Sequence, residues 1–200
     1  MTIVTIQPNE TDALDAFIAN GTYQSNNYGT HASLFIGRAD SGVFYRGCIQ
    51  FDFAVIPAGA IIDSAKLNLT VNVAGELNNT VAIHRLLVDW SESQVTWLIR
   101  KTGTNWKTAG GFDDDDCEQT AMASKVIESG TAVGTKITFN LPVSTIQDMV
   151  DGKVTNNGFL IKGTEAGTSR ITFFNSNAAT ESQRPSIDVE YFFPQGIIIL

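Results

Sequence analysis

The chain has 200 residues, 43% of them hydrophobic, which is enough to bury a substantial core in one domain. Its formal net charge of −8, with a pI near 4.6, argues against nucleic-acid binding, which requires a basic surface. No apolar run approaches the roughly 20 residues of a membrane-spanning helix, so neither a membrane span nor a nucleic-acid partner is expected.

The first residues and the cysteines bear on where the chain is made. Residues 1–9 have neither a basic segment nor a long apolar segment, so we expect no secretory signal peptide. Cys48 and Cys117 are too few for a disulfide framework and are expected to be free thiols. Both observations favour synthesis in a reducing cytoplasm.

Alternation of apolar and polar residues indicates β-strands along most of the chain. The clearest case has Leu67, Leu69 and Val71 separated by Asn68 and Thr70. This period of two predicts a strand with the apolar side chains in a core and both polar side chains in water. Replacing Asn68 by alanine is then expected to cost less than about 1 kcal/mol.

The remaining predicted elements complete an all-β pattern. Short strands separated by turns rich in Gly, Asn and Pro, without a strand–helix rhythm, are typical of an antiparallel β-sandwich or jelly roll. Ser144 is placed to cap a short helix over residues 144–151, and Gly152 is placed to end it. We expect one domain over residues 1–193 and an apolar tail over residues 194–200. The predicted strands, in chain order, are residues 43–53, 64–73, 81–88, 137–141, 159–162, 171–174 and 187–191.

The sequence contains no recognisable catalytic motif. His31 lies in a polar loop and His84 in a predicted strand, and neither lies in a nucleophile elbow or at zinc-binding spacing. Pairs of carboxylates are abundant, but 21 acidic residues provide such pairs in any strand-rich chain. We therefore expect no enzymatic activity.

An acidic segment is a weak candidate for a calcium site. Oxygen-rich loops suit Ca²⁺, yet four consecutive aspartates cannot all face one ion, and the spacing of known calcium loops is missing. A solvated acidic loop is the favoured interpretation, structural calcium is the alternative, and no other cofactor is expected. The segment consists of Asp113, Asp114, Asp115 and Asp116.

The three tryptophans Trp90, Trp97 and Trp106 fall close together in the sequence. An exposed group of tryptophans would stack on sugar rings, whereas a buried group would wedge into the core of a sandwich. The sequence favours burial and leaves the exposed alternative open.

Several motifs resemble those of DNRLRE-type domains. Residues 46–69 look like the central signature of these domains, and residues 89–97 with Trp106 look like their Trp-rich segment. Weaker likenesses extend the resemblance from about residue 12 to residue 192. The resemblance implies a β-jelly-roll module, often called carbohydrate-binding, that occurs in secreted polysaccharide-active enzymes and in cell-surface and phage virion proteins.

The resemblance also implies a shared structural frame. Residues common to the family are expected to serve packing and internal hydrogen bonds more than a variable ligand. They are Phe51, Pro57, Trp90, Glu92, Thr96, Trp97, Trp106, Arg184 and Pro185.

The tail ends in four large apolar residues that lie beyond the resemblance. Burying them gains about 25 cal/mol per Å² of apolar surface. They either fold back as a last strand or dock on a neighbouring subunit by strand addition, and docking is our hypothesis. The docking residues are Ile197, Ile198, Ile199 and Leu200.

Together these observations favour a phage structural protein. The hypothesis is a non-enzymatic capsid decoration or cement subunit on the virion surface, made in the host cytoplasm, with sister subunits or the major capsid protein as partners. The alternative is a carbohydrate-binding module or a receptor-binding tail component that recognises a surface polysaccharide. The net charge of −8 argues against an acidic polysaccharide.

Overall fold

The structure is a computed structural model that describes residues 1–7 and 14–194. It contains one helix, α1 (Val143–Val150), and two short 3₁₀ turns, at Gly21–Tyr23 and Glu181–Gln183. The strands are β1 (Thr2–Ile6), β2 (Leu14–Ala19), β3 (Ser33–Arg38), β4 (Phe44–Gln50), β5 (Ile61–Val73), β6 (Asn79–Arg85), β7 (Ile99–Lys101), β8 (Thr104–Asn105), β9 (Ala123–Ile127), β10 (Lys136–Asn140), β11 (Phe159–Lys162), β12 (Ile171–Phe174) and β13 (Ser186–Phe192).

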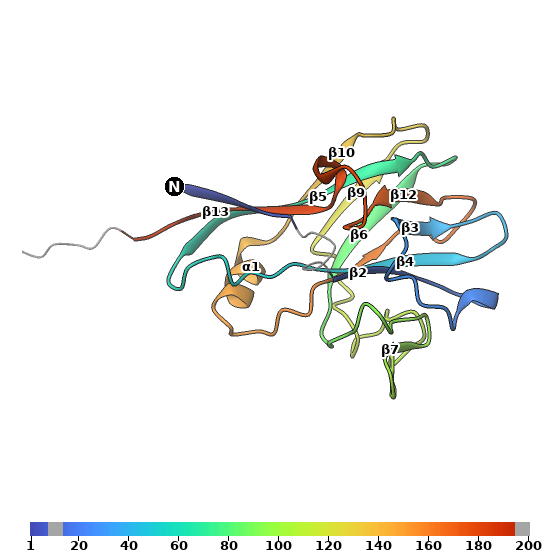
Figure 1. Ribbon diagram of the computed structural model, residues 1–200, viewed down its shortest axis with the longest axis horizontal. Helices are drawn as coiled ribbons and strands as arrows, with labels where there is room; N and C mark the ends of the chain where they lie inside the picture. The colour runs from blue at the N-terminus through green and yellow to red at the C-terminus, as the bar shows by residue number, and fades with distance from the viewer. Residues whose placement is uncertain (8–13, 195–200) are drawn as a thin grey trace, which may run out of the picture.

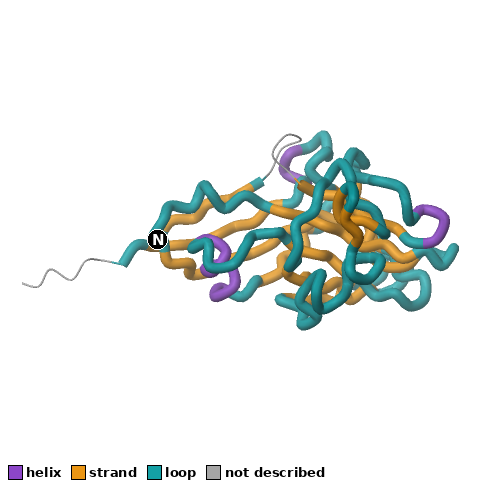
Figure 2. Tube along the Cα trace, turned by 90° about the horizontal axis from the view of Figure 1, so that it is seen from below, coloured by secondary structure: helices purple, strands orange, loops and turns teal. Residues whose placement is uncertain are grey.

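Eleven strands form one continuous sheet that curls upon itself (Figures 1 and 2). Their order is β1-β13-β5-β12-β3-β4-β11-β6-β9, with β10 also paired to β5 and β2 to β4, and every pairing is antiparallel. Strand β3 joins the two halves because it pairs with β12 in one and with β4 in the other. The predicted all-β antiparallel fold with one short helix is confirmed.

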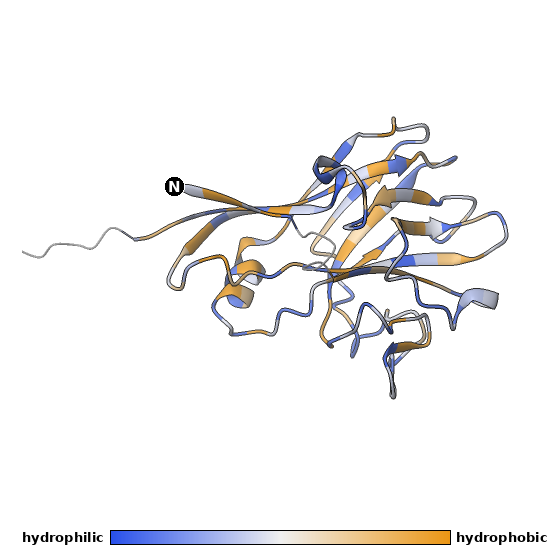
Figure 3. Ribbon diagram, viewed as in Figure 1, coloured by the Kyte–Doolittle hydropathy of each residue, from blue (hydrophilic) through white to orange (hydrophobic). Residues whose placement is uncertain are grey.

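The main core lies between the two halves of the curled sheet. Phe17, Leu67, Leu69, Ile83 and Phe159 are among its fully buried side chains. Figure 3 shows apolar residues along the strands and on α1, which packs against β5. A smaller apolar cluster lies on the other face of β2, β4 and β11, where residues 86–117 cover the sheet.

Strand β5 corrects one prediction from the sequence. Leu67, Leu69 and Val71 are fully buried as predicted, but Asn68 and Thr70 are only 4% and 3% exposed. Asn68 donates through Nδ2 to the side chains of Ser186 and Asp188 on β13, and its Oδ1 accepts the hydroxyl of a threonine on β10. Neighbouring strands on both edges of β5 therefore bury this polar face by hydrogen bonding to it.

Helix α1 matches its predicted position to within one residue, but its cap does not match. The N-cap residue is Pro142, and no side chain caps the helix, so Ser144 lies inside the first turn. Gly152 ends the helix as predicted, with φ of +70° and its N–H donated to the carbonyl of Met149.

The predictions for the two cysteines and for the tail have different outcomes. Cys48 and Cys117 are free and buried. The predicted docking residues Ile197–Leu200 lie outside the described residues, so tail docking stays a prediction. Within residues 1–7 and 14–194, no helix is long and apolar enough to cross a membrane.

Candidate binding site

Residues 86–117, which we call the tryptophan segment, lie against the sheet and contribute to the smaller apolar cluster. Trp90, Trp97 and Trp106 are each less than one tenth exposed. The indole N–H of Trp90 donates to the carbonyl of Asn157 at 3.0 Å, and that of Trp106 donates to the carbonyl of Thr96 at 2.9 Å. With their rings packed and both of these N–H groups satisfied, the tryptophans offer no exposed platform for a sugar.

Arg46 fastens the tryptophan segment to β4. Its guanidinium carbon lies 4.7 Å from the ring centroid of Trp97, and its Nη1 donates to the carbonyl of Gly110 at 2.8 Å. Its Nε lies 2.7 Å from Oε1 of Glu165. Gly110 has φ of +92°, and a Cβ there would lie 2.6 Å from both the Arg46 Nη1 and the Trp97 ring. An ion pair, a hydrogen bond and a cation–π contact thus hold the guanidinium in place inside the fold.

The other frame residues also contact the protein itself. Phe51 is buried in the main core, and Pro185 is buried immediately before β13. The hydroxyl of Thr96 accepts two backbone N–H groups, and Nε of Arg184 donates to a backbone carbonyl. Pro57 is exposed in a turn, where its carbonyl accepts a backbone N–H.

The aspartates of the acidic segment form hydrogen bonds and an ion pair within their own loop. Asp116 is buried and accepts the backbone N–H groups of Lys107 and Thr108 at 2.9 and 3.1 Å. Asp113 accepts the hydroxyl of Thr108, Asp115 pairs with Lys107, and the remaining aspartate is exposed. In the described part of the chain, no three His, Cys, Asp or Glu side chains are placed to hold a metal ion together.

Asp15 is fully buried and contacts the partly buried Glu92 through its backbone. The backbone N–H of Asp15 donates to Glu92 Oε1 at 3.0 Å, and Asp15 Oδ2 accepts the backbone N–H of Ser176 at 2.8 Å. Asp15 Oδ1 has no hydrogen-bond partner among the described residues. Burial raises the pKa of Asp15 to about 6 and also raises the pKa of Glu92. Because Asp15 is fully buried, no substrate reaches it, and the pair belongs to the fold.

Replacing Asp15 by asparagine is expected to stabilise the protein at neutral pH. The folded carboxyl binds its proton more tightly than the unfolded one, whose pKa is near 3.8. Its contribution to the free energy of unfolding is therefore full below about pH 4 and is lost as the pH rises towards 6. The loss amounts to about 3 kcal/mol, which Asp15→Asn avoids because the amide stays uncharged.

The measurement is urea unfolding of both proteins between about pH 4 and pH 8. We expect the stability difference between them to grow from about pH 4 to about pH 6 and to stay level from there to pH 8. Asp114→Asn, at an exposed position, is the control and should show no such growth. A difference for Asp15→Asn that is independent of pH would contradict the raised pKa.

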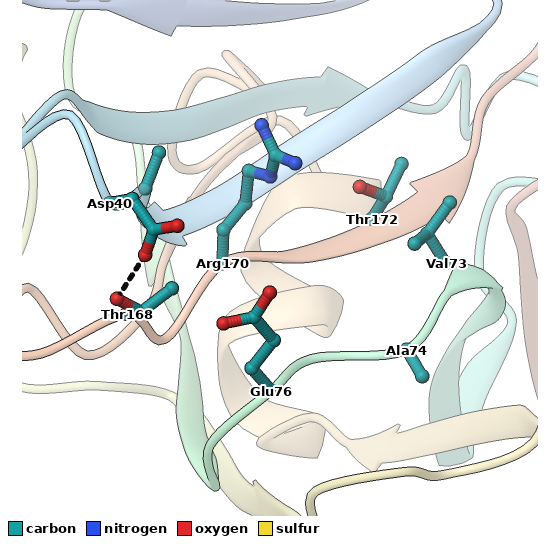
Figure 4. A pocket seen from close by; sticks show the side chains of 8 residues that line it. Asp40, Val73, Ala74, Glu76, Thr168, Arg170 and Thr172 are labelled. Atoms are coloured by element: carbon teal, nitrogen blue, oxygen red, sulfur yellow. Dashed lines mark hydrogen bonds between the residues drawn. The ribbon is translucent and has the colours of Figure 1, made fainter.

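A shallow hollow of about 120 Å³ lies where the loop between β3 and β4 meets the end of β5 and the start of β12 (Figure 4). The hydroxyl of Thr168 donates to the carboxylate of Asp40, and the carboxylate of Glu76 points into the hollow. The lining residues are Ala39, Asp40, Val73, Ala74, Glu76, Thr168, Arg170 and Thr172.

Arg170 connects this hollow to a group of aromatic rings. Its guanidinium carbon lies 5.2 Å from the centroid of Phe35 and 6.0 Å from that of Tyr45. Phe35 stacks on Phe17, with their centroids 4.7 Å apart, and Phe17 stacks on Tyr28 at 4.1 Å. Phe35 and Tyr28 are only partly buried, so parts of both rings remain accessible. We call Phe17, Tyr28, His31, Phe35 and Tyr45 the aromatic cluster.

The hollow and the aromatic cluster together offer two kinds of contact. Carboxylate, guanidinium and hydroxyl groups exchange hydrogen bonds with polar ligands, and the accessible ring surfaces pack against apolar ones. Among the described residues, neither histidine ring is hydrogen-bonded to a nucleophile: a ring nitrogen of His31 lies near the backbone of Ser33, and that of His84 near the carbonyl of Glu118. The side chains of the hollow and the aromatic cluster are therefore suited to binding a ligand.

No motif in the sequence singles out the residues of the hollow. Asp40, Glu76 and Arg170 lie on three segments that are far apart in the chain. Only the strand order, which places β3 beside β12 and β12 beside β5, brings them together. The one local signal is the turn at residues 165–167, which precedes Thr168.

Comparison with protein families gave a match over most of the chain. The model of a family described as the disaggregatase related repeat domain matches residues 19–189, from the end of β2 into β13. The match includes the hollow and the tryptophan segment. The likeness to DNRLRE-type domains stays a resemblance. A comparison with curated proteins gave no match. Because the family model covers most of its length, the chain belongs to the disaggregatase related repeat domain family.

Proposed function

We propose that this domain is a non-enzymatic module that binds a neutral polysaccharide through the hollow and the aromatic cluster. The observation that carries the proposal is the position of Arg170. Its guanidinium lies over the rings of Phe35 and Tyr45, while the same residue lines the hollow beside Asp40 and Glu76. A sugar chain presents hydroxyl groups and apolar ring faces, and this surface supplies a partner for each.

The charges of the site favour a neutral ligand. The hollow contains two carboxylates and one guanidinium, and the whole chain carries a net charge of −8. An anionic polysaccharide would be repelled by this field, whereas sugar hydroxyls donate readily to carboxylates.

The resemblance supports a binding module, and the description of the family as a repeat domain fits one. The family is described as a repeat domain, and repeated weak sites suit attachment to a polymer through multivalency. The DNRLRE-type modules that the motifs resemble are often called carbohydrate-binding. Asp15, which contacts Glu92 through its backbone, is fully buried and closed to substrate, so these two carboxylates provide no support for glycosidase chemistry.

Affinity electrophoresis through gels that contain neutral polysaccharides tests the proposal. Glu76→Gln removes a charged acceptor from the hollow and is expected to weaken binding by about tenfold or more. The matched control is Glu128→Gln, which makes the same change at an exposed position after β9. Equal retardation of the two variants, or no retardation of the parent protein on any gel, would contradict the proposal.

A second candidate is a capsid decoration or cement subunit on a virion surface. It is favoured by the end of β13, where Phe192 and Phe193 are 36% and 50% exposed immediately before the apolar tail. Such an end suits docking on a shell protein or on sister subunits.

Removing residues 196–200 tests this second candidate. The truncation is expected to leave the melting temperature nearly unchanged and to abolish the assembly that the tail itself mediates, onto a shell protein or sister subunits. A truncated protein that is less stable but still assembles would show instead that the tail is a last strand of the core.

A further inference from the structure

Strand β1 is an edge strand with unusual chemistry. It pairs with β13 along one side, and no other strand of the described residues pairs with its outer side. Its sequence, Thr-Ile-Val-Thr-Ile, is β-branched at every position and contains no charge and no proline. An outer edge of this composition is a template for pairing with another strand.

The exposed face of this end of the sheet carries both apolar and charged side chains, and Ile3 lies beside Lys66, Asp188 and Glu190. Ile3 is 67% exposed and lies opposite Glu190, which places it on the same face as Phe192. Phe192 is 36% exposed and pairs with Ile61, which is 40% exposed. The uncharged edge strand therefore borders a face on which exposed apolar side chains of β1, β13 and β5 alternate with charged ones.

The opposite edge of the curled sheet is protected. Strand β9 pairs only with β6 among the described residues, and it carries the exposed Lys125 in its centre. A lysine on an edge strand is a common device against pairing with other chains. Strand β1 carries no such charge.

We propose that β1 pairs in antiparallel fashion with β1 of a second copy of this chain, centred on Val4. The strand is self-complementary in this arrangement, because Ile3 of each copy then lies opposite Thr5 of the other, and a two-fold interface needs one such surface. The pairing also lets two acidic molecules meet along strands that carry no charge.

This inference does not depend on polysaccharide binding, but it has a consequence for it. Strand β1 lies at one end of the long axis, and the loop between β3 and β4, which contributes Asp40 to the hollow, lies at the other (Figure 1). Pairing through β1 therefore places the two hollows at the outer ends of the dimer. A dimer of this form links two sugar chains.

Sedimentation velocity from about 1 to about 200 μM tests the proposal, and we expect a dimer whose dissociation constant falls within this range. Ile3→Lys places a charge on the exposed face of β1, beside Glu190, and is expected to weaken dimerisation by about tenfold or more while the melting temperature changes little. The matched control is Val126→Lys on β9, where the parent side chain is 57% exposed, and this variant should dimerise normally.

Removal of residues 196–200 separates this interface from tail docking. The β1 dimer is expected to persist in the truncated chain. A parent protein that is monomeric at every concentration, or an Ile3→Lys variant that dimerises as well as Val126→Lys, would overturn the proposal. Loss of the dimer on truncation alone would also overturn it.

Discussion

Replacing Gly158 by alanine is expected to lower the free energy of unfolding by about 3 to 5 kcal/mol. Gly158 lies immediately before β11 and has φ of +78°, a conformation that is strained for any residue with a Cβ. That Cβ would lie 2.2 Å from the carbonyl oxygen of Ile49 and 2.8 Å from Cα of Gln50. Both atoms belong to the backbone of β4, which cannot shift without disturbing its pairing with β2 and β11.

Gly130 provides a matched control for this substitution. Its φ is +72°, but a Cβ built there meets no atom within 4 Å. Gly130→Ala should therefore cost only the backbone strain, about 1 to 2 kcal/mol. Urea unfolding of both variants measures the difference, and equal losses would contradict the close approach of the Gly158 turn to β4.

Leu69→Ala is expected to cost about 2 to 5 kcal/mol, because it leaves a cavity at a fully buried position in the main core. Asn68→Ala is expected to cost about 1 to 3 kcal/mol, more than the alternation pattern alone predicts. It removes hydrogen bonds to the side chains of Asp188 at 2.8 Å and Thr138 at 2.7 Å, and leaves these partners partly buried.

Lys66→Ala is the control for Asn68, because Lys66 lies on the same face of β5 and is exposed. Its expected effect is within about 0.5 kcal/mol. If thermal or urea unfolding shows that Asn68→Ala costs no more than Lys66→Ala, the polar face of β5 is solvated, as the period of two first indicates.

Strand β5 was predictable from its alternation, and β4 and β11, which are buried on both faces, were predictable from their dense apolar runs, but β2 was not. The alternation around Leu69 reveals β5. In β2, by contrast, Phe17 packs into the main core while Ala16 and Ile18 pack into the smaller cluster, so no period of two is visible. The burial of Asn68 depends on β10 and β13, which are remote in sequence, and no local pattern reports it.

The candidate site was the least predictable part of the molecule. The resemblance implies packing roles for residues such as Trp97, and Trp97 lies against Arg46. The hollow, by contrast, depends on strand order, because Asp40, Glu76 and Arg170 carry no motif and are exposed polar residues on separate segments. Such residues look ordinary in a sequence, and only the meeting of three segments distinguishes them.

Titration of the isotopically labelled protein with a neutral oligosaccharide, followed by amide chemical shifts, tests the proposed function most directly. The proposal predicts that shifts concentrate at Asp40, Glu76 and residues 168–172, with further shifts at Tyr28 and Phe35. Shifts confined to the tryptophan segment or to β1, or no shifts with any neutral oligosaccharide, would contradict it.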